Sequence, residues 1–77
     1  PQIYMYGEVQ RPGTQILLRD TTLLQALATG GGLTLRGTER GIRVHRRDAS
    51  GQVKVIQPEM NDKLQPGDVI YVRESLF

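Results

Sequence analysis

Apolar and polar positions alternate near the start of the chain. Ile3 and Met5 fall on one side of an extended segment, and Tyr4 and Tyr6 fall on the other. This period of two is typical of a strand with one covered face. The residues "TQILL" at 14–18 are expected to form its antiparallel partner, which makes a first hairpin.

A second hairpin is predicted in the middle of the chain. Ile42 and Val44 alternate with Arg43 and His45, and the segment 52–55 alternates in the same way. The intervening "DASGQ" has the residue types of a turn. Because register fixes which side chains share a face, Ile42 and Val44 are expected to point one way and Arg43 and His45 the other.

One helix is predicted over residues 22–29. Thr22 and Gln25 have capping-box spacing, and the apolar residues Leu23, Leu24, Leu27 and Ala28 recur at helical intervals. Gly30, Gly31 and Gly32 follow the helix. A phosphate-binding loop needs its glycines before a helix, so we interpret Gly30 and Gly31 as a helix end, with Gly30 left-handed.

Two Pro-Gly pairs predict turns. Pro12 with Gly13, and Pro66 with Gly67, place proline and glycine at the second and third positions of type II turns. The segment Val69 to Val72 is apolar on both faces, as in a central strand.

The predicted order is strand, strand, helix, strand, strand, strand, in a single domain spanning residues 1–77. One short helix can bury a core only by lying across a small mixed sheet, so the fold class is α+β with a β-grasp arrangement. The predicted core joins Leu23, Leu24 and Leu27 to Ile3, Met5, Val44, Val55 and Tyr71.

Positive charge is concentrated in one segment. The net charge is +2, but residues 36–47 hold five arginines and one acidic residue, a local charge of +4. Arginine suits paired contacts with carboxylate or phosphate, so this segment could face an acidic polysaccharide, an anionic lipid surface or an acidic patch on another subunit. The candidate binding residues are Arg36, Arg40, Arg43, His45, Arg46 and Arg47.

Nucleic acid is not an expected partner of this segment. Base stacking needs aromatic side chains among the basic ones, and Tyr4, Tyr6 and Tyr71 are expected to lie elsewhere.

The sequence offers little catalytic chemistry. It has no cysteine and one histidine, His45, which is interpreted as a surface residue rather than a general base. Glu8, Asp62 and Asp68 lie beside turns, where carboxylates commonly accept backbone N–H groups, and lack metal-ligand spacing. We therefore predict a non-enzymatic domain with no metal and no cofactor.

Three motifs carry a family resemblance. "YGEVQRPGTQILL", "TTLLQALATGGGLT" and "LQPGDVIYV" resemble, in order and spacing, the soluble-ligand-binding β-grasp (SLBB) domain of outer-membrane polysaccharide export proteins. Two features depart from that pattern: "LRGTERGIRVHRR" is richer in arginine, and the amino-terminal export domain is absent. Because the chain starts at Pro1 without methionine, we expect a fragment of a longer exporter.

The resemblance implies a periplasmic module at the outer membrane of a Gram-negative bacterium, which helps to assemble a ring and to line a polymer passage. Its partners would be other copies of the full-length protein and an inner-membrane export partner. Similar domains bind cobalamin or lie within a respiratory dehydrogenase, so a small-ligand module is one alternative. A ubiquitin-like interaction domain is another, although the tail "RESLF" lacks the Gly-Gly end of a modifier.

Overall fold

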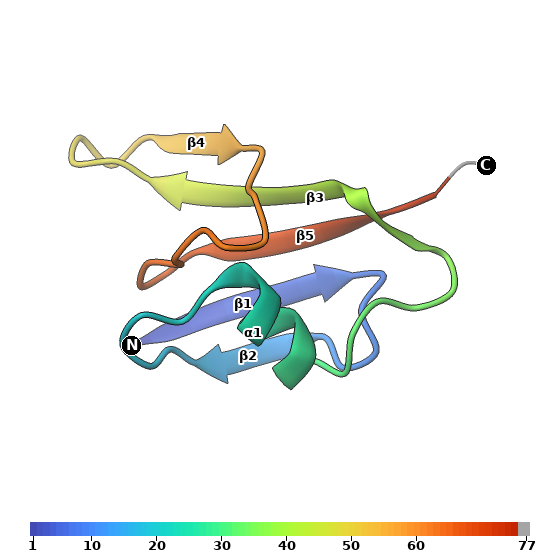
Figure 1. Ribbon diagram of the computed structural model, residues 1–77. Coiled ribbons are helices and arrows are strands. Elements are labelled where there is room, and N and C mark those ends of the chain that lie inside the picture. The colour runs from blue at the N-terminus through green and yellow to red at the C-terminus, as the bar shows by residue number, and fades with distance from the viewer. Residues whose placement is uncertain (76–77) are drawn as a thin grey trace.

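The computed structural model describes residues 1–75 and contains one short helix and one five-stranded sheet (Figure 1). This is the predicted α+β, β-grasp-like arrangement. The elements in chain order are β1 (Gln2–Gly7), β2 (Gly13–Ile16), α1 (Leu23–Thr29), β3 (Gly37–Arg47), β4 (Val53–Ile56) and β5 (Val69–Glu74).

The last strand lies in the centre of the sheet. The strand order is β2-β1-β5-β3-β4, with β5 parallel to β1 and antiparallel to β3. Ile70 and Val72 are fully buried on β5, which confirms the central strand predicted from the apolar run. The two predicted hairpins, β1 with β2 and β3 with β4, are therefore joined through the end of the chain.

Local signals set both ends of α1. The Thr22 side chain accepts the Gln25 N–H and the Gln25 side chain accepts the Thr22 N–H, which confirms the capping box. At the other end, Gly31 donates to the Ala28 carbonyl and Gly32 to the Leu27 carbonyl, the pairing of a Schellman motif. The left-handed residue is Gly31 (φ 85°) rather than Gly30 (φ −79°), so the predicted conformation of Gly30 is wrong.

The two Pro-Gly pairs behave differently. Asp68 N–H donates to the Gln65 carbonyl across Pro66 and Gly67, and Gly67 has φ 83°, as the type II turn requires. The tight turn predicted at Pro12 and Gly13 is wrong, because Gly13 already pairs with Met5 as the first residue of β2.

The wider connection between β1 and β2 has a physical reason. Val9 enters the core at 3% exposure, and the Gln10 and Arg11 N–H groups donate to the Gly32 and Gly30 carbonyls. This segment therefore pairs with the chain that leaves α1 instead of closing a tight turn.

The core lies between α1 with its neighbouring loop and one face of the sheet. The loop 57–68 runs along the helix start, where the Leu23 and Leu24 N–H groups donate to the Asp62 and Met60 carbonyls. The buried apolar residues are Ile3, Met5, Val9, Leu17, Leu23, Ala26, Leu27, Ile42, Val44, Leu64, Ile70 and Val72.

Three residues assigned to the core do not belong to it. Leu24 is 53% exposed, because a helix this short buries one stripe, which Leu23, Ala26 and Leu27 occupy. Val55 is 61% exposed, because the core side of β4 is taken by Ile56, which pairs with Val44. Tyr71 is half-buried on the opposite face of the sheet.

Candidate functional site

The sheet face opposite α1 carries a continuous set of partly exposed side chains. Register pairs Tyr4 with Val69, Val69 with His45, and His45 with Val55, so one row crosses four strands. We call this surface the open face; alternation along the strands assigns to it Gln2, Tyr4, Tyr6, Thr14, Ile16, Arg43, His45, Arg47, Val53, Val55, Val69, Tyr71 and Arg73.

Aromatic side chains occupy the middle of the open face. Tyr6 pairs with Tyr71 across β1 and β5, and their ring centroids lie 4.8 Å apart at an interplanar angle of 39°. Tyr4 stands two residues before Tyr6 and is 41% exposed, while Tyr6 is 42% exposed. Large aromatic groups that stay accessible beside polar atoms are typical of binding surfaces.

Basic side chains border these tyrosines on β3. Arg43 is directly opposite Tyr71, and His45 and Arg47 follow at alternate positions. The Arg43 Nη1 donates to the Arg40 carbonyl at 3.1 Å and to the Ile42 carbonyl at 2.8 Å, and the Arg47 Nη1 donates to the Gly51 carbonyl at 2.8 Å. These bonds hold the guanidinium groups close to the backbone without neutralising their charge.

The expectation that the aromatic residues lie away from the arginines is therefore wrong. Tyr71 lies between Tyr6 and Arg43, although the three residues are far apart in sequence, because β5 inserts between β1 and β3. The sequence signal for this arrangement was the alternation along each strand. Tyr4 and Tyr6 alternate with Ile3 and Met5 and so point to the opposite face of the sheet, and Arg43 alternates with Ile42 in the same way. Sequence reasoning missed all three tyrosines as candidate site residues.

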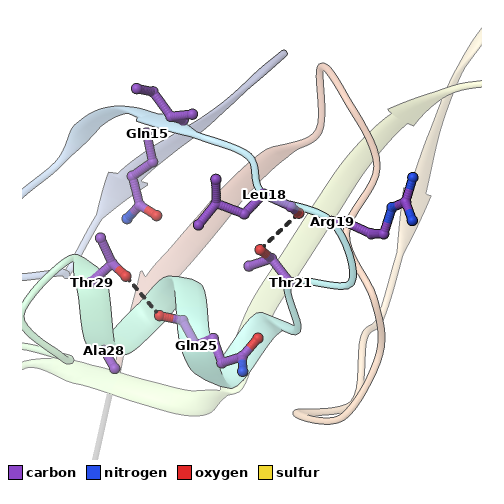
Figure 2. Close-up of a pocket in the computed structure, with 8 residues that line it drawn as sticks. Gln15, Leu18, Arg19, Thr21, Gln25, Ala28 and Thr29 are labelled. Atoms are coloured by element: carbon purple, nitrogen blue, oxygen red, sulfur yellow. Dashed lines mark hydrogen bonds between the residues drawn. The ribbon is translucent and has the colours of Figure 1, made fainter.

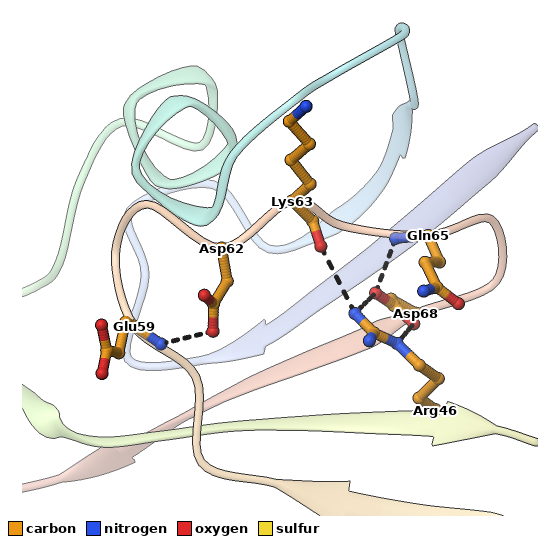
Figure 3. Close-up of polar contacts among 6 residues, drawn as sticks. All are labelled: Arg46, Glu59, Asp62, Lys63, Gln65 and Asp68. Carbon is orange, nitrogen blue, oxygen red and sulfur yellow. Dashed lines mark hydrogen bonds and ion pairs between the residues drawn. The ribbon is translucent and has the colours of Figure 1, made fainter.

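Arg46 belongs to the other face of β3. Its Nε donates to Asp68 Oδ1 at 3.0 Å and its Nη2 to Asp68 Oδ2 at 2.8 Å, a bidentate ion pair (Figure 3). Asp68 is 1% exposed and also accepts the Gln65 N–H, as expected for a carboxylate beside a turn. The hydrogen bond to Asp68 raises the pKa of Arg46 above its ordinary value. This arginine ties β3 to the start of β5.

The remaining predicted arginines lie near the beginning of β3. Arg36 precedes the strand, and Arg40 falls within an irregular stretch where the pairing with β5 shifts between Gly37 and Ile42. At roughly 3.3 Å per residue, Arg36 and Arg47 lie on the order of 30 Å apart along the chain. The structure thus places Arg43, His45 and Arg47 on one face of β3 and Arg46 on the other, with Arg36 and Arg40 outside the regular β3–β5 pairing.

A groove of about 440 Å³ lies between β2 and α1 (Figure 2). Many of its polar groups are engaged within the fold: Thr21 Oγ1 donates to the Leu18 carbonyl, Thr29 Oγ1 donates to the Gln25 carbonyl, and Gln25 caps the helix. The Gln15 Nε2 likewise donates to the Ala26 carbonyl. Few polar groups are left to orient a ligand there.

Within residues 1–75, no three histidine, cysteine or acidic side chains gather as metal ligands would. In the same part of the chain, no helix has the length and apolar character needed to cross a membrane. Asp62 accepts the nearby Glu59 N–H, as predicted for a carboxylate beside a turn. The Glu8 carboxylate instead accepts the hydroxyl of Thr34, a side chain that is distant in sequence.

Comparison with known families gives one match. Residues 2–57 match the family model described as SLBB domain, which covers β1 to β4 and ends before β5. No curated protein matches the chain. SLBB domains are binding domains that occur in periplasmic polysaccharide export proteins. The match extends over more than half of the sequence and agrees with the fold, and the chain therefore belongs to the SLBB domain family.

Proposed function

We propose that this chain is a non-catalytic module of a polysaccharide export protein on the periplasmic side of a Gram-negative outer membrane. In this role it helps copies of the full-length protein to assemble into a ring and lines the passage of the polymer. Family membership supports the export role, because SLBB domains occur in such proteins.

The observation that carries the proposal is the difference between the two faces of the sheet. One face is closed by α1 and the loop 57–68, and the other presents tyrosines, valines and basic groups. A surface with accessible aromatic and arginine side chains suits contact with another molecule. In a ring, the open face would be directed toward the passage.

The edges of the sheet suit contacts between copies. The end strands are β2 and β4, and each has one unpaired side. Ile16 on β2 is 75% exposed, and Val53 on β4 is 52% exposed. Because the two edges differ, a contact from β2 of one copy to β4 of the next would be heterologous, and such contacts generate rings when the rotation closes.

The small-ligand alternative has one feature in its favour, the groove between β2 and α1. A soluble ligand held there should bind saturably to the monomer, and Ala28→Phe, which places a larger side chain in the groove, should weaken that binding. Chemical-shift changes confined to the groove residues would support this alternative over the export role.

Deletion of the chain from the full-length protein tests the proposal. Loss of polymer secretion and of the oligomer, at normal protein abundance in the periplasm, is the expected result. The 77 residues alone should sediment as a monomer or a weak associate, since ring contacts between small modules depend on the effective concentration supplied by the remaining chain. Normal secretion by the deletion variant would overturn the proposal.

A further inference from the structure

We infer that the open face binds an acidic saccharide, a glycan segment in which sugar rings carry carboxylate groups. The inference rests on the proposed function and adds the chemical class of the polymer and the residues that contact it. The contact residues are Tyr4 and Tyr6 on β1, Tyr71 on β5, and Arg43 and Arg47 on β3.

The tyrosines supply flat apolar contact area next to hydroxyl groups. The C–H faces of a pyranose are apolar and its rim is polar, so an accessible tyrosine matches both parts of a sugar ring. Tyr6 and Tyr71 pack against each other at 4.8 Å, which fixes their rings before any ligand arrives. Less side-chain freedom is then lost on binding.

Arg43 offers a free guanidinium edge beside this aromatic pair. Its Nη1 is occupied by the Arg40 and Ile42 carbonyls, while Nε and Nη2 make no hydrogen bond within the described residues. An Nε and Nη2 edge is the fork that binds a carboxylate through two parallel hydrogen bonds. Since Arg43 pairs with Tyr71 in register, a sugar ring on the tyrosines would hold its carboxylate near this fork.

The charged side chains assigned to the open face are all basic. Arg43, Arg47 and Arg73 lie on it with His45, and none of the assigned open-face residues is acidic. Arg43, His45 and Arg47 alternate along β3 at roughly 7 Å intervals, the spacing of every second residue on a strand. The two arginine charges on β3, spaced along one strand, complement an extended chain with repeated negative charges better than they complement a single small anion.

Single-stranded nucleic acid is the competing ligand, because accessible aromatic rings beside arginines also suit the stacking of bases. Nucleic acid binding is therefore a competing outcome that the experiment must separate.

The test uses the 77-residue chain with short polygalacturonate oligosaccharides as the acidic probe. Uncharged malto-oligosaccharides of equal length and single-stranded oligonucleotides are the comparison ligands, with binding followed by calorimetry and backbone amide shifts. The variants are Arg43→Gln and Tyr6→Ala, with Arg43→Lys retaining charge without the fork. Arg19→Gln, beside the groove, and Leu24→Ala, on the exposed side of α1, are matched controls on the opposite layer.

We expect polygalacturonate to bind most tightly and to shift amides of β1, β3 and β5. Arg43→Gln should weaken binding about tenfold, the effect of losing a charge-assisted hydrogen-bonded pair. Arg43→Lys should recover part of that loss, Tyr6→Ala should weaken binding severalfold, and the controls should bind as the unmodified chain does. Thermal melting of each variant separates lost binding from lost structure.

Three results would overturn the inference: equal binding of charged and uncharged saccharides, tighter binding of oligonucleotides, or equal losses in Arg43→Gln and Arg19→Gln. A failure of the acidic-saccharide inference can be distinguished from a failure of the proposed export role. If the chain does not bind polygalacturonate but its deletion abolishes secretion, the export role stands and the acidic-saccharide inference fails.

Discussion

The two faces of the sheet are built from the same strands but obey different constraints. On the face toward α1, Ile42 and Val44 are almost fully buried, and Arg46 on that face is paired with the buried Asp68. On the open face, Arg43 and His45 are half-buried neighbours of tyrosines. Packing dictates residue type on the first face. On the second it does not, so the side chains there are free to serve recognition.

Matched isoleucine substitutions should give the largest contrast between the faces. Ile70 is completely buried on β5, and Ile70→Ala should lower the free energy of unfolding by about 2 to 5 kcal/mol through lost burial and a cavity. Ile16, on the open side of β2, is 75% exposed, and Ile16→Ala should change it by less than about 0.5 kcal/mol. Denaturant unfolding measures both. Equal losses of stability in Ile70→Ala and Ile16→Ala would show that side chains on the open face are also packed within the fold.

The pair between Arg46 and Asp68 should give the next largest effect. Asp68→Ala leaves the partly buried Arg46 guanidinium and the Gln65 N–H without their acceptor, so stability should fall by about 2 to 4 kcal/mol. The exposed pair of Lys63 and Asp20, 3.3 Å apart, is the control, and Asp20→Ala should cost no more than about 1 kcal/mol.

A result in which these two variants lose similar stability would contradict the assignment of Arg46 as a fold-stabilising residue. Arg46 would then count among the side chains available for binding, together with Arg43 and Arg47.

Short-range features were predictable because adjacent residues determine them. Thr22 with Gln25 capped the helix, the glycines after it ended it, and Pro66 with Gly67 made the expected turn. Alternation also placed Ile42 and Val44 correctly. The fold class followed from the number and order of these elements.

The site depended on strand order, which local patterns do not contain. Alternation alone does not say that Tyr6 and Arg43 flank Tyr71, because β5 comes last in sequence and lies centrally in the sheet. The same limit explains Arg46: it stands three residues from Arg43, on the opposite face, and its partner Asp68 lies across the β3–β5 junction. A run of arginines therefore looked like one cluster, although the fold separates its members.

Acid should weaken the turn at the far end of the β3–β4 hairpin. The Ser50 hydroxyl, followed by the backbone N–H groups of Gln52 and Ser50, stabilises the Asp48 carboxylate and lowers its pKa from the ordinary 3.8. The folded pKa is depressed, so this contribution is fully present above the unfolded pKa and is lost as pH falls through the folded value.

Asp48→Asn should therefore melt lower than the unmodified chain near neutral pH, and the gap in melting temperature should narrow as the pH falls through and below the ordinary carboxyl value of 3.8. Thermal melts across this range measure the gap. A gap that stays constant with pH would assign the difference to turn geometry rather than to the carboxylate charge.

The smallest effect on stability should come from charge reversal on the open face. Arg43→Glu with Arg47→Glu removes three local hydrogen bonds to backbone carbonyls, and exposed charges contribute little, so stability should change by about 1 kcal/mol or less. Polymer secretion or ring formation by the full-length protein should nevertheless fall, and any residual binding should weaken with salt, since exposed charges are screened beyond about 8 Å at physiological ionic strength. The matched control is Arg11→Glu with Arg19→Glu, an equal charge change at two positions outside the assigned open face. Reduced secretion in the first double variant alone would locate function on the open face, whereas normal secretion at normal abundance would leave its arginines as a solubilising surface.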